Sequence, residues 1–188
     1  MGCVMSDARE INDCFVAEAR KTLRRMHGKI VHCVGQLSDE DLNWRAFPGA
    51  NSIGNIVTHL CGNVTQWIVD AVGRTPSRRN RPGEFAQDLT VRREKLLANL
   101  AAVVRAADET IASVTAETAL LPLRVQGFEE TPISAIFHAV THFEGHTHQI
   151  IYITRLRLGE RYVFKWVPGT PEQVSGGNQK VETRMTNQ

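Results

Sequence analysis

The sequence predicts an all-α protein that folds as an antiparallel four-helix bundle. Four long segments, near residues 7–36, 52–73, 88–115 and 132–158, carry apolar residues at the three- and four-residue spacing of an amphipathic helix. Runs of turn-forming residues separate these segments. A chain of 188 residues with 42% hydrophobic content can bury one substantial core. We therefore expect a single domain over residues 1–188.

The first helix is expected at residues 7–36. Asp7 and Glu10, three residues apart, form a capping pair at its start. The apolar residues that follow at spacings of three, four or seven are Ile11, Phe15, Ala19, Met26, Ile30, Val34 and Leu37. This pattern predicts a helix of about seven turns. A short flexible segment, residues 1–6, is expected to precede it.

The second helix is expected at residues 52–73. The turn formers of LSDEDLNWRAFPGANS end the first helix, and we expect Trp44 and Phe47 to anchor this loop in the core. Asn51 or Ser52 is expected to cap the second helix, because both side chains can accept a hydrogen bond from a free backbone amide. The apolar positions of this helix are Ile53, Val57, Leu60, Val64, Trp67 and Ala71.

The third helix is expected at residues 88–115, after the break GRTPSRRNRPGEF. We interpret the arginines of this break, Arg78, Arg79 and Arg81, as part of a solvated loop, with phosphate binding as the alternative. The apolar positions of the third helix are Leu96, Leu100, Val103, Ala107 and Ile111.

The fourth helix is expected at residues 132–158. Thr131 can cap its start, and Pro132 stands at the first helical position, where proline is favoured. Gly159 follows its end, as is common at helix C-termini. Residues 169–188 have few apolar side chains to bury, so they are expected to form a flexible tail.

Composition argues against several classes of protein. The 22 Lys+Arg and 20 Asp+Glu residues give a net charge of only +2, so no strong field attracts nucleic acid or anionic lipid. No apolar run approaches the roughly 20 residues of a membrane helix, and the start does not have the pattern of a signal peptide. The cysteines form no CxxC pair and are interpreted as free thiols: Cys3, Cys14, Cys33 and Cys61. We predict a cytoplasmic protein that binds neither nucleic acid nor membrane.

The start of the chain, MGCVMS, matches the pattern for myristoylation at Gly2, with Cys3 placed for a second acyl chain. The pattern is short and recurs by chance. We interpret the segment as unstructured residues before the first helix, with acylation as the alternative.

The segment HAVTHFEGHTHQI, residues 138–150, holds four of the seven histidines. At about 100° per residue, His138, His142 and His146 lie on one stripe of the predicted helix, at the border of its apolar face. His148 falls on the opposite, polar face. Two inward histidines one turn apart can bind one metal ion through neutral imidazole nitrogens. Hydrogen-bonded core histidines are the alternative.

A third ligand to the same ion must come from another helix. His59 lies in the second predicted helix, on the edge of its apolar stripe, where a side chain can reach the interior of a bundle. The alternative is a core histidine bonded to a carbonyl oxygen. Cys61 points about 200° away from His59 around this helix, so no cysteine is expected as a ligand.

The segments around His59 and around His142 and His146 together resemble a known family. NSIGNIVTHLCGNVTQWI and HAVTHFEGHTHQIIYI resemble the DinB-like (DinB/YfiT) superfamily of four-helix metal-binding proteins, and the resemblance covers residues 7–165. In that superfamily one histidine of the second helix and two of the fourth hold a divalent metal. The resemblance therefore implies His59, His142 and His146 as ligands. The chain departs from the pattern at His148, where HTHQI replaces HTGQI; this outward change can alter packing against a partner subunit.

The resemblance implies a metal-dependent enzyme that acts on a small molecule, either a thiol-dependent transferase or isomerase or a hydrolase. Three protein ligands leave coordination positions open to water or a thiol, as in catalytic sites. For the transferase or isomerase, the resemblance implies a low-molecular-weight thiol as the co-substrate. Imidazole ligands suit zinc, nickel, copper or iron, and we favour zinc or nickel. A non-catalytic, dimeric or stress-related metal-binding module is the alternative.

Other polar groups near the expected site are candidates to assist it, with hydrogen bonding inside the bundle as the alternative role: Asn55, Asn63, Gln66 and His138. No residue is assigned as catalytic. The fourth helix is apolar over a wide arc, which favours a homodimer. A nucleic-acid-associated stress protein is a further alternative that rests only on the arginine-rich loop and on the naming of the superfamily.

Overall fold

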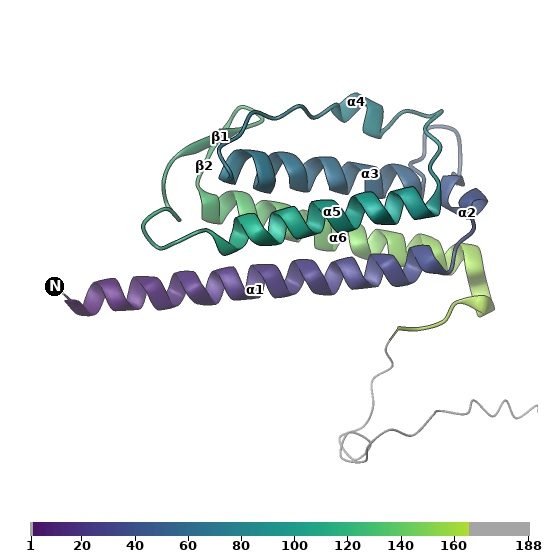
Figure 1. The fold of residues 1–188 in the computed structure, drawn as a ribbon. Helices are drawn as coiled ribbons and strands as arrows, with labels where there is room; N and C mark the ends of the chain where they lie inside the picture. The colour runs from purple at the N-terminus through teal and green to yellow at the C-terminus, as the bar shows by residue number, and fades with distance from the viewer. Residues whose placement is uncertain (1, 166–188) are drawn as a thin grey trace, which may run out of the picture.

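The computed structural model describes the backbone of residues 2–165 and the side chains of residues 7–165. The expected tail at 169–188 lies outside the described residues, as do the side chains of the MGCVMS segment. The structure is built on a bundle of long helices: α1 (Gly2–Gly35), α3 (Ile53–Val64) with its π-helical continuation η1 (Thr65–Val72), α5 (Arg93–Ala112) and α6 (Pro132–Leu158) (Figure 1). The all-α prediction is confirmed.

Short elements connect these helices: α2 (Asp39–Asn43), α4 (Arg81–Glu84), β1 (Leu123–Val125), β2 (Phe128–Glu130) and η2 (Gly159–Arg161). The two strands form an antiparallel hairpin, with Val125 opposite Phe128. Its turn residues, Gln126 and Gly127, both have positive φ, as a tight hairpin turn requires. None of these short elements was predicted, because each is too short to show a period. No described helix is long and apolar enough to cross a membrane.

The directions of the four helices do not simply alternate. α1 contacts α5 and α6, and α3 contacts the same two helices, so α1 and α3 lie on one diagonal of the bundle. Hydrogen bonds from Asn12 to Val114 and from Arg20 to Asp108 show that α1 and α5 are antiparallel. α3 and α6 are antiparallel too, whereas α1 runs parallel to α6, and α3 to α5 (Figure 1). The connection over residues 73–92 causes these directions. It leads the chain back to the end of the bundle at which α3 begins, so that α5 starts at the same end as α3.

Most predicted helix ends agree with the structure. Ser52, one of the two expected caps, caps α3 in a reciprocal pair with Asn55, and Thr131 caps α6 ahead of Pro132. α1 begins at Gly2, so Asp7 and Glu10 lie inside the helix and the predicted capping pair is wrong.

α5 begins at Arg93, five residues after the expected start at 88. Asn43 explains this difference, because its side chain donates to Val91 O and accepts from Val91 N, both at 2.9 Å. These two bonds hold the chain before α5 out of helical geometry. α5 ends at Ala112, also earlier than the expected residue 115.

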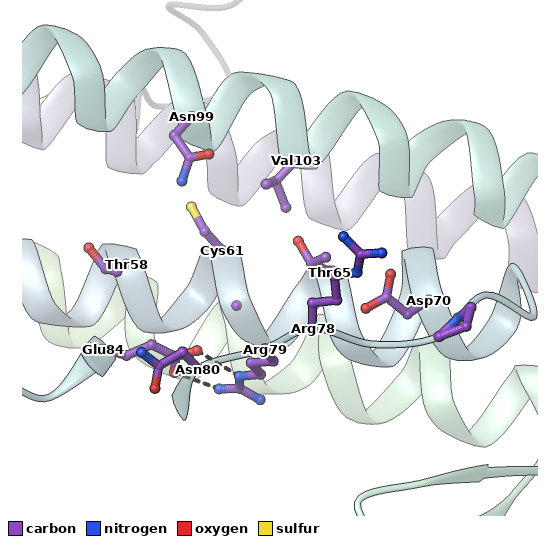
Figure 2. Close-up of a pocket in the computed structure, with 12 residues that line it drawn as sticks. Thr58, Cys61, Thr65, Asp70, Arg78, Arg79, Asn80, Glu84, Asn99 and Val103 are labelled. Carbon is purple, nitrogen blue, oxygen red and sulfur yellow. Dashed lines mark hydrogen bonds and ion pairs between the residues drawn. The ribbon is translucent and has the colours of Figure 1, made fainter. Parts of the chain in front are cut away.

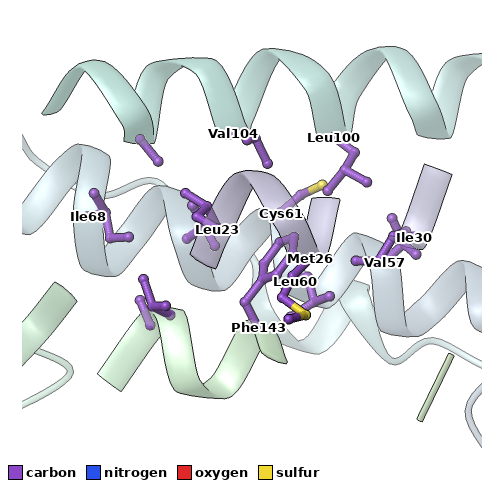
Figure 3. Packing of buried hydrophobic residues seen from close by; sticks show 14 of the residues in the cluster. Leu23, Met26, Ile30, Val57, Leu60, Cys61, Ile68, Leu100, Val104 and Phe143 are labelled. Carbon is purple, nitrogen blue, oxygen red and sulfur yellow. The ribbon is translucent and has the colours of Figure 1, made fainter. Parts of the chain in front are cut away.

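The core lies along the axis of the bundle. Each long helix contributes fully buried side chains to it, among them Leu23, Met26, Ile30, Leu60, Leu100 and Phe143 (Figure 3). Phe47 is 65% exposed, so its predicted anchoring role is wrong. Leu42 of α2 is fully buried and anchors this loop instead. Trp44 is half-buried beneath the guanidinium of Arg157, 4.7 Å from the ring centre.

Candidate metal centre

Three histidines meet between α3 and α6. His59 of α3 and His142 and His146 of α6 each offer a ring nitrogen, and these nitrogens all lie within 4.8 Å of one another. Nε2 of His59 is 2.8 Å from Nε2 of His142. The ring centre of His146 is 5.2 Å from that of His59 and 4.5 Å from that of His142. The structure thus brings together the three side chains singled out in the sequence.

Helix geometry explains this meeting. His142 and His146 are one turn apart on α6, and the fully buried Phe143 fixes which face of α6 turns inward. Since α3 runs antiparallel to α6, the middle of α3 lies opposite this turn, and His59 occupies that middle. His148 is exposed, which agrees with its predicted outward position.

Glu84 of α4 holds the ring of His59. The Nδ1–H of His59 donates to Glu84 Oε2 at 2.9 Å, and both side chains are 6% exposed. Since a carboxylate oxygen only accepts, this bond places the proton of His59 on Nδ1 and leaves a lone pair on Nε2. Nε2 is the nitrogen that faces the other histidines, so Glu84 sets the tautomer that a metal ligand needs.

Arg79 fixes Glu84 in turn. Its Nε and Nη2 donate to the two carboxylate oxygens, each at 2.7 Å (Figure 2). Its Nη1 donates to Gln66 Oε1 at 3.0 Å. The Arg79 side chain is only 4% exposed, so its interpretation as a solvated loop residue is wrong. Arg78 and Arg81 are exposed, as expected. Arg79 differs because the connection between η1 and α5 folds over α3 and buries this one guanidinium.

The segment that carries Arg79 and Glu84 lies close against α3. Asn55 donates to the backbone carbonyls of Glu84 and Ala86, at 2.8 and 3.2 Å. Gly62 leaves room for the carboxylate, because a Cβ at this position would overlap Glu84 Oε1 and lie 3.0 Å from Arg79 Nε. On the α5 side, the Arg79–Glu84 pair lines a cavity of about 460 Å³ (Figure 2).

Burial keeps two of the three histidines, His59 and His142, in the form that binds metals. It lowers the pKa of His142 to about 4, and the nearby His146 and His59 add to this effect. Burial also lowers the pKa of His59, although Glu84 acts in the opposite direction. Both imidazoles are therefore neutral near pH 7, and the neutral form of imidazole is the one that can bind a metal.

The other candidate residues take different positions. Asn55 serves the cap of α3 and the α4 segment, and Gln66 bonds Arg79, so both have hydrogen-bonding roles. His138 is exposed and stacks on Trp67 with 3.9 Å between ring centres, outside the three-histidine cluster. Asn63 is buried, and its Oδ1 has no partner among the described residues.

Cys61 takes no part in the cluster. This agrees with the prediction that it points away from His59 around the helix. It is buried on the α5 side of α3, where burial raises the pKa of its thiol to about 12. Such a thiol stays protonated and unreactive near neutral pH. Cys14, Cys33 and Cys61 are all free thiols, as expected.

Comparison with known proteins agrees with the architecture. A family model described as "Protein of unknown function (DUF1572)" matches residues 10–169. The chain belongs to this family. Comparison with curated proteins finds no match.

Two solved structures share the fold of this DUF1572 protein. A conserved protein from Enterococcus faecalis is 16% identical, with a TM-score of 0.65 over 76% of this chain and 96% of that one. A DinB-like protein from Bacillus cereus is also 16% identical, with a TM-score of 0.56 over 70% of this chain and 85% of that one. The likeness to the Bacillus cereus protein confirms the DinB-like fold that the sequence resemblance implied, and this DUF1572 chain combines that fold with a three-histidine cluster.

Proposed function

We propose that this protein binds one divalent metal ion through His59, His142 and His146. The observation that carries the proposal is the convergence of three imidazoles on one point between α3 and α6, with the tautomer of His59 set by Glu84. A carboxylate behind a ligating histidine is the usual support of such sites. The donor set fits zinc or nickel, which we favour among the ions that imidazole binds.

We further propose that the bound ion serves catalysis, in a thiol-dependent transferase or isomerase or in a hydrolase. The ion would supply a Lewis acid that keeps a bound thiol or water deprotonated near neutral pH. Two buried groups support a substrate position beside it. Asn63 and Trp67 follow His59 at four-residue steps, and Asn63 Oδ1 and Trp67 Nε1 have no partner among the described residues. One can accept and the other donate a hydrogen bond to a small molecule.

Metal content per chain tests the proposed ligands. Protein purified without added metal is expected to carry one zinc or nickel ion per chain by elemental analysis. His59→Ala, His142→Ala and His146→Ala should each lose most of this metal. His148→Ala is the matched control and should keep it, because His148 lies on the exposed face of the same helix. Retention of metal by the His142 or His146 variant, with loss by the His148 variant, would refute the assignment.

A second measurement separates an enzyme from a metal-binding module without activity. The metal-loaded protein is assayed against small electrophiles with a panel of low-molecular-weight thiols, and against ester and amide substrates without thiol. We expect turnover in one of these assays, with loss in His142→Ala. A flat result across both panels, with the metal present, would favour the module.

We also propose a homodimer that forms through the outer face of α6. Phe137, Tyr152 and Leu156 on this face are 63%, 65% and 60% exposed, although each is a large apolar or aromatic side chain. His148 lies on the same face. Exposed apolar side chains that share one helix face are typical of an interaction surface.

A further inference from the structure

A second cavity lies between α1 and the C-terminal half of α6. Its volume is about 800 Å³, within the roughly 300–1,000 Å³ of small-molecule sites. Its lining comes from α1, α6 and the segment that follows η2, and no residue of α3 contributes. This cavity is therefore separate from the three-histidine cluster, which lies between α3 and α6.

The outer wall of the cavity is held in place by hydrogen bonds. Val163 N donates to Gln36 Oε1 at 2.8 Å, and Val163 O contacts His32 Nε2 at 2.6 Å. Lys165 Nζ donates to Gly28 O at 2.7 Å. These bonds fix the segment after η2 against α1, so the wall is a part of the fold.

The interior surface of this cavity is apolar and aromatic in part. Ile151 of α6 lines it together with Tyr162 and Phe164, whose rings meet edge to face at 5.1 Å. Phe164 is 55% exposed, so its ring still has apolar surface to bury. A ligand with an apolar body would cover that surface, with a favourable free energy of burial.

The charge of the cavity lining is entirely positive. Five of the chain's 22 basic residues line it, and no aspartate or glutamate among the described residues does: Arg24, Arg25, Lys29, Arg155 and Lys165. Arg24 pairs with Asp108 at 2.6 Å, and Arg25 reaches Glu144 at 3.5 Å. Lys29 and Arg155 form no ion pair with any described residue. In a chain of net charge +2, this local excess is complementary to an anion.

We propose that this cavity binds a soluble amphipathic anion of the fatty-acid type. The alkyl chain would lie against Ile151, Tyr162 and Phe164, and the carboxylate would pair with Lys29 and Arg155. A guanidinium and an ammonium are the groups that bind carboxylates in proteins. The inference does not depend on the metal proposal, because the two sites share no residue.

Isothermal titration calorimetry with dodecanoate tests this site. Binding at one molecule per chain is expected, and dodecanol, which has the same chain without the charge, should bind at least tenfold more weakly. The double variant Lys29→Glu/Arg155→Glu should weaken dodecanoate binding by about 100-fold, since each of the two lost charge-assisted hydrogen bonds costs about tenfold. Lys95→Glu/Arg105→Glu on exposed positions of α5 makes the same change of charge and should bind dodecanoate like the wild type.

Three results would overturn the proposal. The first is that dodecanol binds as tightly as dodecanoate, and the second is that the two double variants lose the same affinity. In the third case, the protein would bind vesicles of anionic phosphatidylglycerol but no free dodecanoate, which would assign the charges to a membrane surface. Circular dichroism should show wild-type helix content for both double variants. A loss of binding is then due to the changed cavity and not to unfolding.

Discussion

At the scale of single residues, the candidate centre depends on Glu84 as much as on the histidines. A neutral imidazole has two tautomers, and only one of them leaves a lone pair on the nitrogen that faces the cluster. The bond from His59 Nδ1 to Glu84 selects this tautomer. The bidentate contact with Arg79 keeps the carboxylate in place. Together, Arg79, Glu84 and His59 form a positioning chain behind the site.

Replacement of Glu84 by glutamine should therefore weaken metal binding without removal of any ligand. We expect affinity to fall about 10–100-fold, the usual effect of changing a partner behind a ligating histidine. The glutamine has the same size, but it can present its amide nitrogen to His59 and leaves the charge of Arg79 buried and unpaired. Competition against a metal chelator measures the affinity. Glu109→Gln, at an exposed position of α5, is the control, and equal affinities in the two variants would contradict the role of Glu84.

At the scale of secondary-structure elements, the site requires α4 and its preceding loop to lie directly on α3. Gly62 allows this approach, because any side chain there would occupy the space of the Glu84 carboxylate. Glycine in the middle of a helix otherwise costs roughly 0.5–1 kcal/mol relative to alanine. Its presence inside α3 is explained by the contact between the two elements.

Gly62→Ala should consequently lower both stability and metal affinity. Overlap with Glu84 and Arg79 should cost about 1–3 kcal/mol in the free energy of unfolding, more than the gain in helix propensity. Gly145→Ala is a matched control, because it lies within α6 with no atom within 4 Å of the added Cβ. This variant should gain about 0.5–1 kcal/mol and bind metal normally. Urea unfolding of the metal-free proteins and a metal titration measure both quantities; a Gly62 variant that behaves like the Gly145 variant would refute the close approach.

At the scale of the whole molecule, burial in the bundle makes the stability of the metal-free protein depend on pH. The pKa of His142 is about 4 in the folded protein, against an ordinary value of 6.5. Above pH 6.5 both the folded and the unfolded states carry a neutral imidazole. Between pH 6.5 and 4 only the unfolded state binds the proton, so the free energy of unfolding decreases as pH falls. Below pH 4 His142 is protonated in both states, so it causes no further decrease in the free energy of unfolding.

We expect this loss to be about 1–2 kcal/mol, smaller than the full shift implies, because the imidazole is only half-buried. Thermal unfolding of chelator-treated protein at several pH values between 7 and 4 should reveal it. His142→Gln removes the titrating group and should flatten the dependence, whereas His148→Gln should retain it. Identical slopes in the wild type and His142→Gln would show that the burial of His142 has no such consequence.

The outer face of α6 also belongs to the scale of the whole molecule. If this face forms the proposed homodimer, sedimentation at micromolar concentration should show a dimer for the wild type. Leu156→Glu places a charge on the face and should yield a monomer of unchanged helix content. Leu120→Glu, at a site that is 70% exposed outside α6, should remain dimeric. A wild-type protein of monomer mass would refute the dimer.

The sequence by itself determined the features that depend on near neighbours in the chain. Apolar periodicity predicted four helices, and local capping patterns predicted the starts at Ser52 and Thr131. The four-residue spacing of His142 and His146 placed both on one face of α6, since helix geometry repeats every few residues. The place of His59 at the edge of an apolar stripe made it a candidate third ligand, the family resemblance supported it, and all three side chains meet in the structure.

Only the tertiary structure decided what depends on the path of the connections. Glu84 lies 25 residues from His59, and their contact follows from a crossover that no local pattern encodes. The same crossover makes α3 parallel to α5 and turns Arg79 from an expected solvent residue into a buried partner of Glu84. Periodicity reports which face of a helix is apolar, but it contains no information about which distant loop will cover that face. The candidate ligands were therefore accessible from sequence, and the residues that orient them were not.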